Sequence, residues 1–138
     1  MSASEHTSDS PRFSTLVDLL RQRAALRADA TAYTFLSDGE AEEEHLTYGE
    51  LDRRARLVAA RLQAAVRPGE RVLLLYPPGL EYVAAFFGCL YAGAVAVPAY
   101  PPRQNQTLQR LQAILSDATP RAALTNAAVA ARSRALSA

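Results

Sequence analysis

Few residues in this sequence have the types and spacing that a self-contained catalytic site requires. The one cysteine, Cys89, lies among Phe and Leu residues without a charged or histidine neighbour that would lower its pKa, so it is expected to be an inert core thiol. His6 and His45 are isolated, and no paired Cys or His residues have the spacing of metal ligands. The sequence contains neither a glycine-rich phosphate loop nor a nucleophile elbow. No complete catalytic site is therefore expected within these 138 residues.

The charged residues limit the chemistry further. All fifteen basic residues are arginine, so a reaction step that depends on a lysine cannot be completed within these residues. Glu40, Glu42, Glu43 and Glu44 precede His45, and this acidic run raises the alternative of a metal site. Consecutive carboxylates on a turn diverge and repel one another, so solvation of the run is expected instead. No metal ligands are assigned.

The segment 70–103 predicts the unit around which the chain is organised. Arg71–Tyr76 is a continuous apolar run that indicates a strand covered on both faces, and Leu80–Ala92 is a helix that is apolar nearly all round. Ala94–Val97 is a second apolar strand, so the pair is expected to be parallel and joined by a right-handed crossover. Ligands gather beyond the carboxyl ends of such strands, and the Pro98–Arg103 loop leaves from that edge.

The amino-terminal elements follow from caps and periodicity. A helix is expected to begin at Ser14, and two extended runs, Ala32–Leu36 and His45–Tyr48, predict a β-hairpin. Thr47 and Glu50 have the spacing of a capping box, which opens a strong helix. The apolar stripe of that helix is expected to comprise Leu51, Ala55, Val58, Leu62 and Ala65.

The carboxy-terminal part continues the alternation of helices and strands. Thr107 is expected to cap a helix that runs to Ala118 and ends before Pro120. The inward side of this helix is expected to carry Leu108, Leu111, Leu115 and Ala118. Arg121–Leu124 predicts a weak short strand, and a last Ala-rich helical segment is expected to begin at Thr125 or Asn126.

This order of elements predicts an α/β fold: a mainly parallel sheet with flanking helices, plus an amino-terminal β-hairpin. Residues 1–12 have the composition of a disordered leader, and residues 13–138 are expected to form one incomplete subdomain. The subdomain is expected to be incomplete because three short parallel strands leave apolar faces and a sheet edge uncovered.

Charge and hydropathy exclude several classes of partner. The net charge of +1 with interspersed signs favours neither a nucleic acid nor an anionic membrane as partner. The apolar region Val83–Tyr100 is not expected to span a membrane, because Gly88, Gly93 and Pro98 divide it into a helix and a strand. The first twelve residues lack the apolar core of a signal peptide, so a cytoplasmic protein is expected.

Four stretches of the sequence carry a resemblance to a known family. They are FSTLVDLL, AYTFLSDGEAEEEHLTYGELDRRARLVAARL, RPGERVLLLYPPGLEYVAAFFGCLYAGAVAVPAYPPR and LQRLQAILSDATPRAALT. Together they cover about Phe13 to Thr125 and resemble the amino-terminal part of the fatty-acyl-AMP ligases, within the superfamily of adenylate-forming enzymes. The superfamily shares the LTYGEL, GERV and AGAVAVP segments. LLLYPPG at 73–79 and VPAYPPR at 97–103 are more similar to the fatty-acyl-AMP ligase branch than to acyl-CoA ligases or amino-acid adenylation domains.

The resemblance implies an activity for the full-length enzyme. A fatty acid and ATP, with Mg²⁺, would give an acyl-adenylate and pyrophosphate. The acyl group would then pass to the phosphopantetheine arm of an acyl carrier protein in polyketide, nonribosomal peptide or lipid synthesis. The resemblance also implies that the fold is the first part of the large amino-terminal domain of an adenylate-forming enzyme.

The sequence departs from the family in length. The family's Ser/Thr/Gly-rich phosphate loop, ribose-binding aspartate, magnesium-binding glutamate and carboxy-terminal lysine have no counterpart in these 138 residues. The chain alone is therefore expected to be inactive and to bind neither ATP nor Mg²⁺, and its partner would be the remainder of its own domain. Two alternatives remain: a non-catalytic interaction module of the same fold, and another acyl-CoA synthetase or amino-acid adenylation branch.

Three residues of the PAYPPR loop are substrate-pocket candidates. Tyr100, Pro101 and Pro102 follow a strand at its carboxyl edge, where they would contribute to the wall of an acyl or adenylate pocket. The alternative is a stiff surface connection whose prolines fix the backbone. No catalytic role is assigned to any residue.

Overall fold

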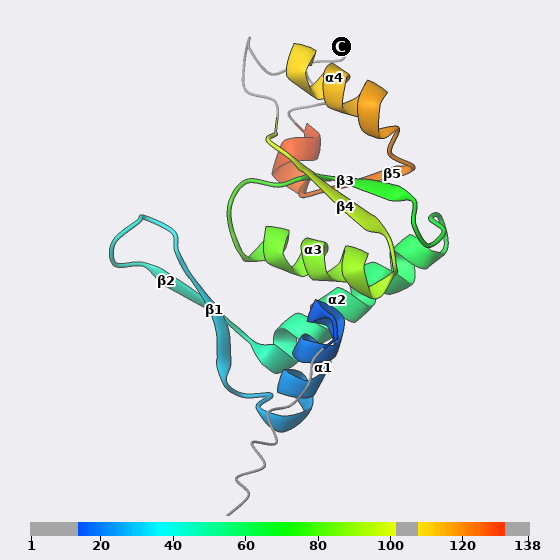
Figure 1. The fold of residues 1–138 in the computed structure, drawn as a ribbon. Coiled ribbons are helices and arrows are strands. Elements are labelled where there is room, and N and C mark those ends of the chain that lie inside the picture. Colours follow the sequence, from blue (N-terminus) through cyan, green and yellow to red (C-terminus); the bar gives the residue numbers. More distant parts are fainter. Residues whose placement is uncertain (1–13, 102–107, 132–138) are drawn as a thin grey trace, which may run out of the picture.

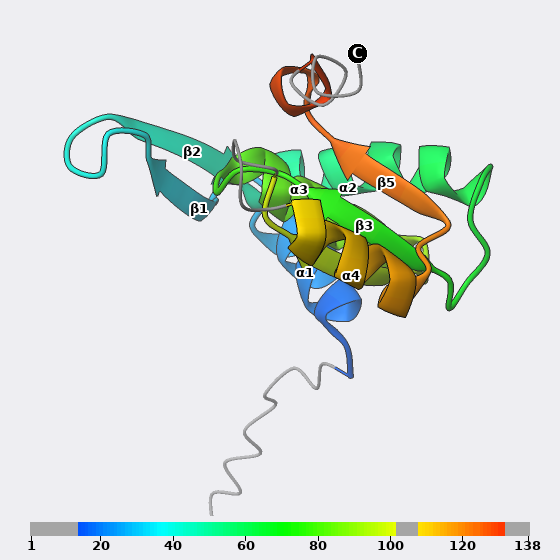
Figure 2. The same cartoon turned by 90° about the horizontal axis from the view of Figure 1, so that it is seen from above.

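The computed structural model describes residues 14–101 and 108–131. In these residues a three-stranded sheet lies between helix α4 on one face and helices α2 and α3 on the other (Figure 1). Helix α1 and the hairpin β1–β2 lie beyond α2 and α3, and the hairpin projects from the body (Figures 1 and 2). The predicted α/β class is confirmed, with a parallel sheet, flanking helices and an antiparallel hairpin.

The sheet contains β3 (Arg71–Leu75), β4 (Val95–Ala99) and β5 (Ala122–Thr125) in the order β4-β3-β5. Both pairings are parallel, so the carboxyl ends of all three strands meet at one edge. The expected bounds of the second strand were wrong at both ends, because it starts one residue after Ala94 and includes Pro98. β4 tolerates the proline because it is an edge strand of this sheet.

Two helices cover one face of the sheet. The capping box of α2 (Tyr48–Gln63) is confirmed, since the Thr47 hydroxyl accepts from the Glu50 amide and the Glu50 carboxylate accepts from the Thr47 amide. Helix α3 (Leu80–Tyr91) packs tightly on α2, where Gly88 lies against Val58. Ala65 was wrongly placed in the apolar stripe of α2: it lies past the end of the helix and is exposed, while Ala59 is buried.

The core consists of two clusters that share these two helices. One cluster joins Val72 and Leu74 of β3 to Leu62 of α2 and to Ala85 and Cys89 of α3. The other joins α2 and α3 to α1 and the hairpin, and it comprises Leu20, Leu46, Leu51, Ala55, Ala84 and Phe87. The hairpin and the sheet are therefore fixed relative to each other through α2 and α3.

The amino-terminal elements differ from their expected bounds by a few residues. α1 (Leu16–Leu26) is capped by Thr15 instead of Ser14, because the Thr15 hydroxyl accepts from the Asp18 amide while the Ser14 hydroxyl donates to the Asp18 carboxylate. The hairpin consists of β1 (Thr31–Leu36) and β2 (Glu43–Thr47). The second expected run thus begins earlier than His45, and Tyr48 already belongs to α2.

The elements after the PAYPPR loop are peripheral. α4 (Leu108–Ala118) is half-buried at Leu111, Ile114 and Ala118, whereas Leu115, which was expected to face inward, is 39% exposed. Arg71 of β3 donates to the Ala118 carbonyl and to the Thr119 hydroxyl, at 2.7 Å each, and so ties the end of α4 to the sheet. After β5 the Asn126 side chain accepts from the Val129 amide and opens a further helical turn. The leader 1–12 and Thr107 lie outside the described residues.

Candidate functional site

The carboxyl edge of the sheet carries the candidate site. β3 ends at Leu75 and is followed by Tyr76, Pro77, Pro78 and Gly79, after which α3 begins. Gly79 has φ +156 and ψ −176, a conformation that is essentially restricted to glycine, so the chain can turn sharply from strand to helix. This turn brings the first residues of α3 beside the end of β4.

A shallow notch of about 280 Å³ lies at this edge. Its lining comes from the turn after β3, from α3 and from the end of β4, and it consists of Tyr76, Pro78, Tyr82, Pro98, Ala99 and Tyr100. Tyr82 stacks on Phe86 one helical turn later, with ring centroids 6.3 Å apart, and this contact restricts the orientation of its ring. The notch therefore combines aromatic and proline walls with backbone segments that are held by secondary structure.

The three predicted site residues have different positions in the structure. Tyr100 lines the notch and is 70% exposed, so it forms the rim. Pro101 is half-buried and is not part of the lining, and Pro102 lies outside the described residues. Sequence reasoning missed Tyr76 and Tyr82. The signal was available for Tyr76, because it follows β3 directly and parallel strands end at a common edge.

Burial raises the pKa of two side chains near this edge, Tyr76 and Cys89. Burial, followed by the nearby Glu81 carboxylate and the Cys89 thiol, raises the pKa of Tyr76 above its ordinary value. Burial also raises the pKa of the Cys89 thiol to about 11, so the thiol stays protonated near neutral pH. This agrees with an inert thiol in the core and gives the site no nucleophile from Cys89.

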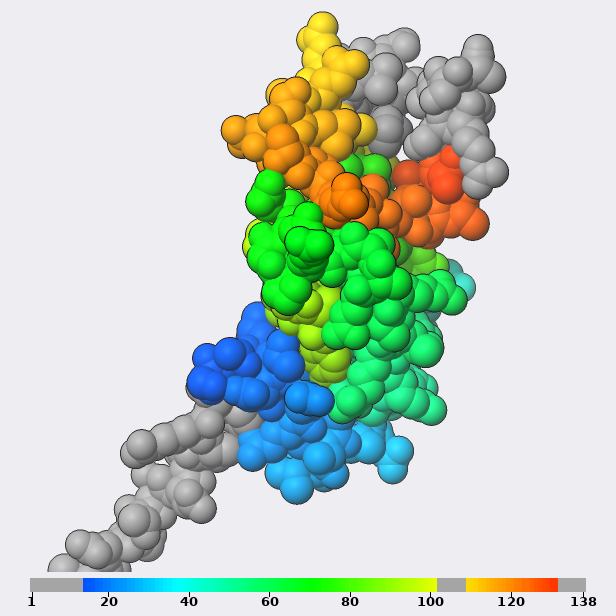
Figure 3. All heavy atoms as spheres, turned by 90° about the vertical axis from the view of Figure 1, so that its right-hand side faces the viewer, coloured from blue at the N-terminus to red at the C-terminus, as the bar shows by residue number. Residues whose placement is uncertain are grey.

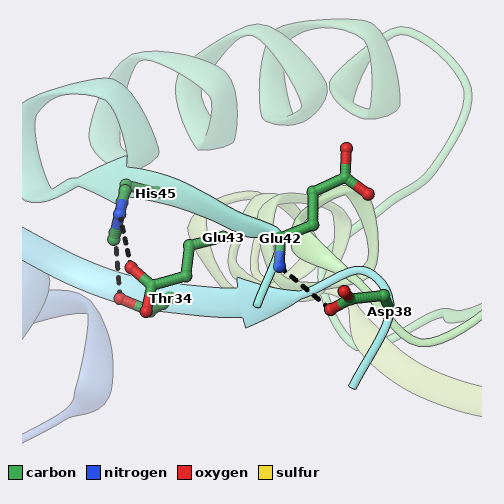
Figure 4. Close-up of polar contacts among 5 residues, drawn as sticks. All are labelled: Thr34, Asp38, Glu42, Glu43 and His45. Atoms are coloured by element: carbon green, nitrogen blue, oxygen red, sulfur yellow. Dashed lines mark hydrogen bonds and ion pairs between the residues drawn. The ribbon is translucent and has the colours of Figure 1, made fainter. Parts of the chain in front are cut away.

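The side chains at the acidic hairpin tip make hydrogen bonds and an ion pair. The His45 ring contacts the Thr34 hydroxyl at 3.0 Å and the Glu43 carboxylate at 3.2 Å, and Asp38 accepts backbone amides of the turn (Figure 4). The Glu42 carboxylate points away from this cluster (Figure 4). Across residues 14–101 and 108–131, no three His, Cys, Asp or Glu side chains gather closely enough to hold a metal ion.

A polar contact joins α2 and α3 away from the notch. The Tyr91 hydroxyl donates to Asp52 Oδ1 at 2.7 Å, and Arg56 Nε donates to Asp52 Oδ2 at 2.9 Å. Burial and the bond to Asp52 raise the pKa of Tyr91, so its phenol stays protonated and continues to donate. These hydrogen bonds connect α3 to α2. They contribute to the site only by holding α3 in place against α2.

The lining of the notch does not suit the phosphates of ATP or a magnesium ion. The notch lining contains no Arg, Asp, Glu or His, and phosphate binding requires guanidinium, ammonium or clustered backbone donors. Mg²⁺ is usually held by one or two carboxylates together with substrate phosphates, and no carboxylate lines the notch. Among the described helices, none is long and apolar enough to cross a membrane.

Comparisons with known proteins place this chain in a family. Residues 20–138 match the family model of the AMP-binding enzyme. The chain is 54% identical over 119 residues to the medium-chain-fatty-acid–[acyl-carrier-protein] ligase JamA of Moorena producens, covering 84% of this chain and 20% of that protein. It is 41% identical to the long-chain-fatty-acid–AMP ligase FadD32 of Mycolicibacterium smegmatis, covering 83% of this chain and 19% of that protein.

The comparison with solved structures finds proteins of the same kind. The fatty acid AMP ligase from Legionella pneumophila superposes with a TM-score of 0.80 at 44% identity, over 84% of this chain and 20% of that protein. The chain thus spans about a fifth of the length of the relatives that it matches. Since the family model covers most of the chain and the fold agrees, this chain belongs to the AMP-binding enzyme family.

Proposed function

We propose that these residues form the opening part of a ligase that activates a fatty acid with ATP as an acyl-adenylate. The observation that carries the proposal is the 54% identity to a medium-chain-fatty-acid–[acyl-carrier-protein] ligase over 119 residues. The superposition on a fatty acid AMP ligase with a TM-score of 0.80 supports it. The identity of 27% to the nonribosomal peptide synthetase FmoA3 is lower, which favours the fatty-acid branch.

The proposed reaction explains why ATP is needed. A carboxylate is a poor electrophile, and exchange of one oxygen for an AMP leaving group makes the carbonyl carbon open to attack. Pyrophosphate leaves in the first step, and in the second the thiol of a carrier protein's phosphopantetheine arm takes the acyl group and releases AMP. The proposal extends to a cytoplasmic enzyme that serves polyketide, nonribosomal peptide or lipid synthesis.

The role of this part of the polypeptide in the proposal is structural. The sheet, with α2 and α3 packed on it, holds the carboxyl edge at which the notch lies. The groups that bind ATP and Mg²⁺ and that stabilise the transition state belong, in this proposal, to other parts of the longer enzyme, because no lysine occurs in the sequence and no charged side chain lines the notch.

ATP–pyrophosphate exchange tests the proposal. The protein encoded by the full reading frame is expected to exchange pyrophosphate in the presence of a medium-chain or long-chain fatty acid, whereas residues 1–138 alone are expected to show no exchange. Exchange with amino acids but not with fatty acids would assign a different branch. Exchange by the isolated residues would contradict the structural role proposed for them.

A non-catalytic interaction module of the same fold is the second candidate. The observation that favours it is helix α4, which forms the upper end of the molecule in Figure 3 and keeps Leu115 39% exposed on its apolar side. A module of this kind would associate through α4. Sedimentation of the 138-residue chain as a folded monomer at high concentration would count against this candidate.

A further inference from the structure

A groove of about 410 Å³ lies beside the notch, between α2 and the end of β5. Its walls come from α2, from α3 and from the residues that follow β3 and β5, and they include Arg54, Leu57, Arg61, Tyr76 and Glu81. Tyr76 lines both the groove and the notch, so the two adjoin at the carboxyl edge of the sheet. The surface of α2 is in view in Figure 3, below the residues that follow β5. A partner that occupied the groove would therefore lie next to the candidate site.

An apolar side chain is exposed in this groove. Leu57 is 66% exposed, whereas Leu51 and Leu62 of the same helix are buried. Arg54 precedes Leu57 by three residues and Arg61 follows it by four, so the three side chains share one face of α2. A single exposed leucine is ordinary on a protein surface. This one lies in a groove between two guanidinium groups, and it gains free energy if a partner removes it from water.

The two guanidinium groups of the groove can bind an anionic group of a partner. Arg56 of the same helix forms an ion pair with Asp52 at 2.9 Å, but neither Arg54 nor Arg61 forms an ion pair with another described residue. Glu81 is the one carboxylate of the lining, so the guanidinium groups outnumber it. This balance of charge favours a partner surface that carries a negative charge.

The second step of the proposed reaction supplies a partner with such a charge. The phosphopantetheine arm is joined to its carrier protein through a phosphodiester, so the carrier surface around the arm has a fixed negative charge. A guanidinium group is well suited to a phosphate, because it can donate two parallel hydrogen bonds to its oxygens. A groove that combines guanidinium groups with an exposed leucine, and that adjoins the candidate site, therefore fits the base of the arm and the protein around it.

We propose that the groove beside α2 is the docking surface for the phosphopantetheine-bearing carrier protein, with Leu57 as the apolar contact and Arg54 and Arg61 as the cations that face the phosphodiester. The inference rests on the proposed function, because it requires a carrier protein as the acyl acceptor. It deepens that function by naming where on this chain the partner binds. The three side chains are positioning residues: they hold the carrier protein, and thereby direct the thiol of its arm.

The test uses the full-length ligase and a phosphopantetheine-bearing carrier protein that the wild-type enzyme acylates. Mass spectrometry of the acylated carrier gives the KM for this protein. Arg61→Glu is expected to raise that KM roughly tenfold, because an attractive pair of charges across the interface becomes a repulsive one. Leu57→Asp is expected to raise it at least as much, since it removes the apolar contact and adds a negative charge. Pyrophosphate exchange with the fatty acid needs no carrier protein and is expected to stay unchanged in both variants.

A matched variant and a salt series serve as controls. Arg110→Glu makes the same change in net charge at an exposed position of α4, on the opposite face of the sheet from α2, and is expected to leave the KM for the carrier protein unchanged. Added salt screens exposed charges, so the wild-type KM is expected to rise with ionic strength. The KM of Arg61→Glu is expected to depend less on salt, because one attractive charge has been lost.

The outcomes separate the inference from the function on which it rests. An Arg61→Glu enzyme with a wild-type KM for the carrier protein overturns the inference, and so does an equal rise in Arg110→Glu, which would reflect overall charge. Loss of pyrophosphate exchange in the groove variants also overturns it, because other parts of the longer enzyme would then cover the groove. In these cases the wild-type enzyme still adenylates the fatty acid and acylates the carrier, so the proposed function stands. A wild-type enzyme that acylates no carrier protein overturns the proposed acceptor and the inference together.

Discussion

The contact between Gly88 of α3 and Val58 of α2 gives a stability prediction that can be worked from the structure. A Cβ atom added at Gly88 would lie 2.5 Å from the Val58 Cβ and 3.3 Å from the Ala55 carbonyl oxygen. Carbon atoms prefer separations of about 3.5–4.0 Å, so the two helices would have to move apart. Since both core clusters include residues of α2 and α3, this movement would disturb packing on both sides of the contact.

The expected cost of Gly88→Ala is about 2 kcal/mol in the free energy of unfolding. Overpacking of this severity costs about 3 kcal/mol, and the better helix propensity of alanine returns about 1 kcal/mol. Val58→Gly is expected to cost about 1.5 kcal/mol, because the half-buried valine loses about 1 kcal/mol of burial and glycine is the poorer helix former. Val58→Ala would relieve the clash only in part, because it removes the close Cγ1 atom but keeps the Val58 Cβ, which is also too close.

The two substitutions together test the reasoning. If their effects were independent, the double variant would be about 3.5 kcal/mol less stable than the wild type. The swap instead restores one small residue at the crossing, so a loss of only about 0.5 kcal/mol is expected and the coupling is about 3 kcal/mol. Urea unfolding followed by circular dichroism measures all four proteins, and Ala60→Gly on the exposed side of α2 gives the propensity cost alone.

Additive effects of the two substitutions would refute this account of the crossing. A Gly88→Ala chain within about 0.5 kcal/mol of the wild type would do so too, because it would mean that α2 and α3 separate without loss of core packing. A change in the slope of the unfolding transition would indicate altered compactness and would call for hydrogen exchange in place of the equilibrium comparison.

Three further predictions concern single side chains. Thr47→Ala removes the capping hydroxyl of α2 and is expected to lower the free energy of unfolding by about 1 kcal/mol in urea, whereas Thr47→Ser should retain most of it. The Cys89 thiol is fully buried, with its pKa raised to about 11, so it is expected to react with a disulfide reagent at pH 8 only as fast as the chain unfolds; rapid reaction in the native state would contradict its placement. The three amides that bond to Asp38 lower its pKa from 3.8 to about 2, so the contribution of this carboxylate to hairpin stability is present above about pH 4 and lost as the pH falls toward 2. An NMR titration of the Glu40–Glu42 amides checks this, with Asp38→Asn, which cannot titrate, as the reference.

Much of the fold could be predicted from the sequence because its signals are local. The Thr47 and Glu50 capping box depends on a spacing of three residues, and the apolar run of β3 is closed by two prolines and a glycine. The stripe of α4 was only partly predictable. A helical period identifies a face about one-third of the circumference wide, and Leu115 lies at its margin, where the packing of neighbours decides exposure.

Of the three residues predicted for the site, Tyr100 is the one that lines the notch, and its role in a substrate pocket stays a prediction. The rule about carboxyl edges pointed to Tyr100, which does line the notch. Tyr82 could not be assigned from sequence spacing alone, because its place in the notch depends on the turn at Gly79 and on stacking against Phe86. The carboxyl end of β4 was predicted too early, at Val97, because a proline usually ends a strand. The strand can include Pro98 because β4 lies at the edge of the sheet.

The proline in β4 also makes the two edges of the sheet differ in their ability to pair with another strand. A strand that approached β4 from outside would find no amide hydrogen at Pro98, whereas β5 contains no proline and has all its amides. The two edges therefore differ in how well they can pair with a further strand. Pairing beside β5 would lose no hydrogen bond to a proline, whereas pairing beside β4 would lose the one at Pro98. Pro98 therefore makes the edge at β5 the more favourable one for pairing with a further strand.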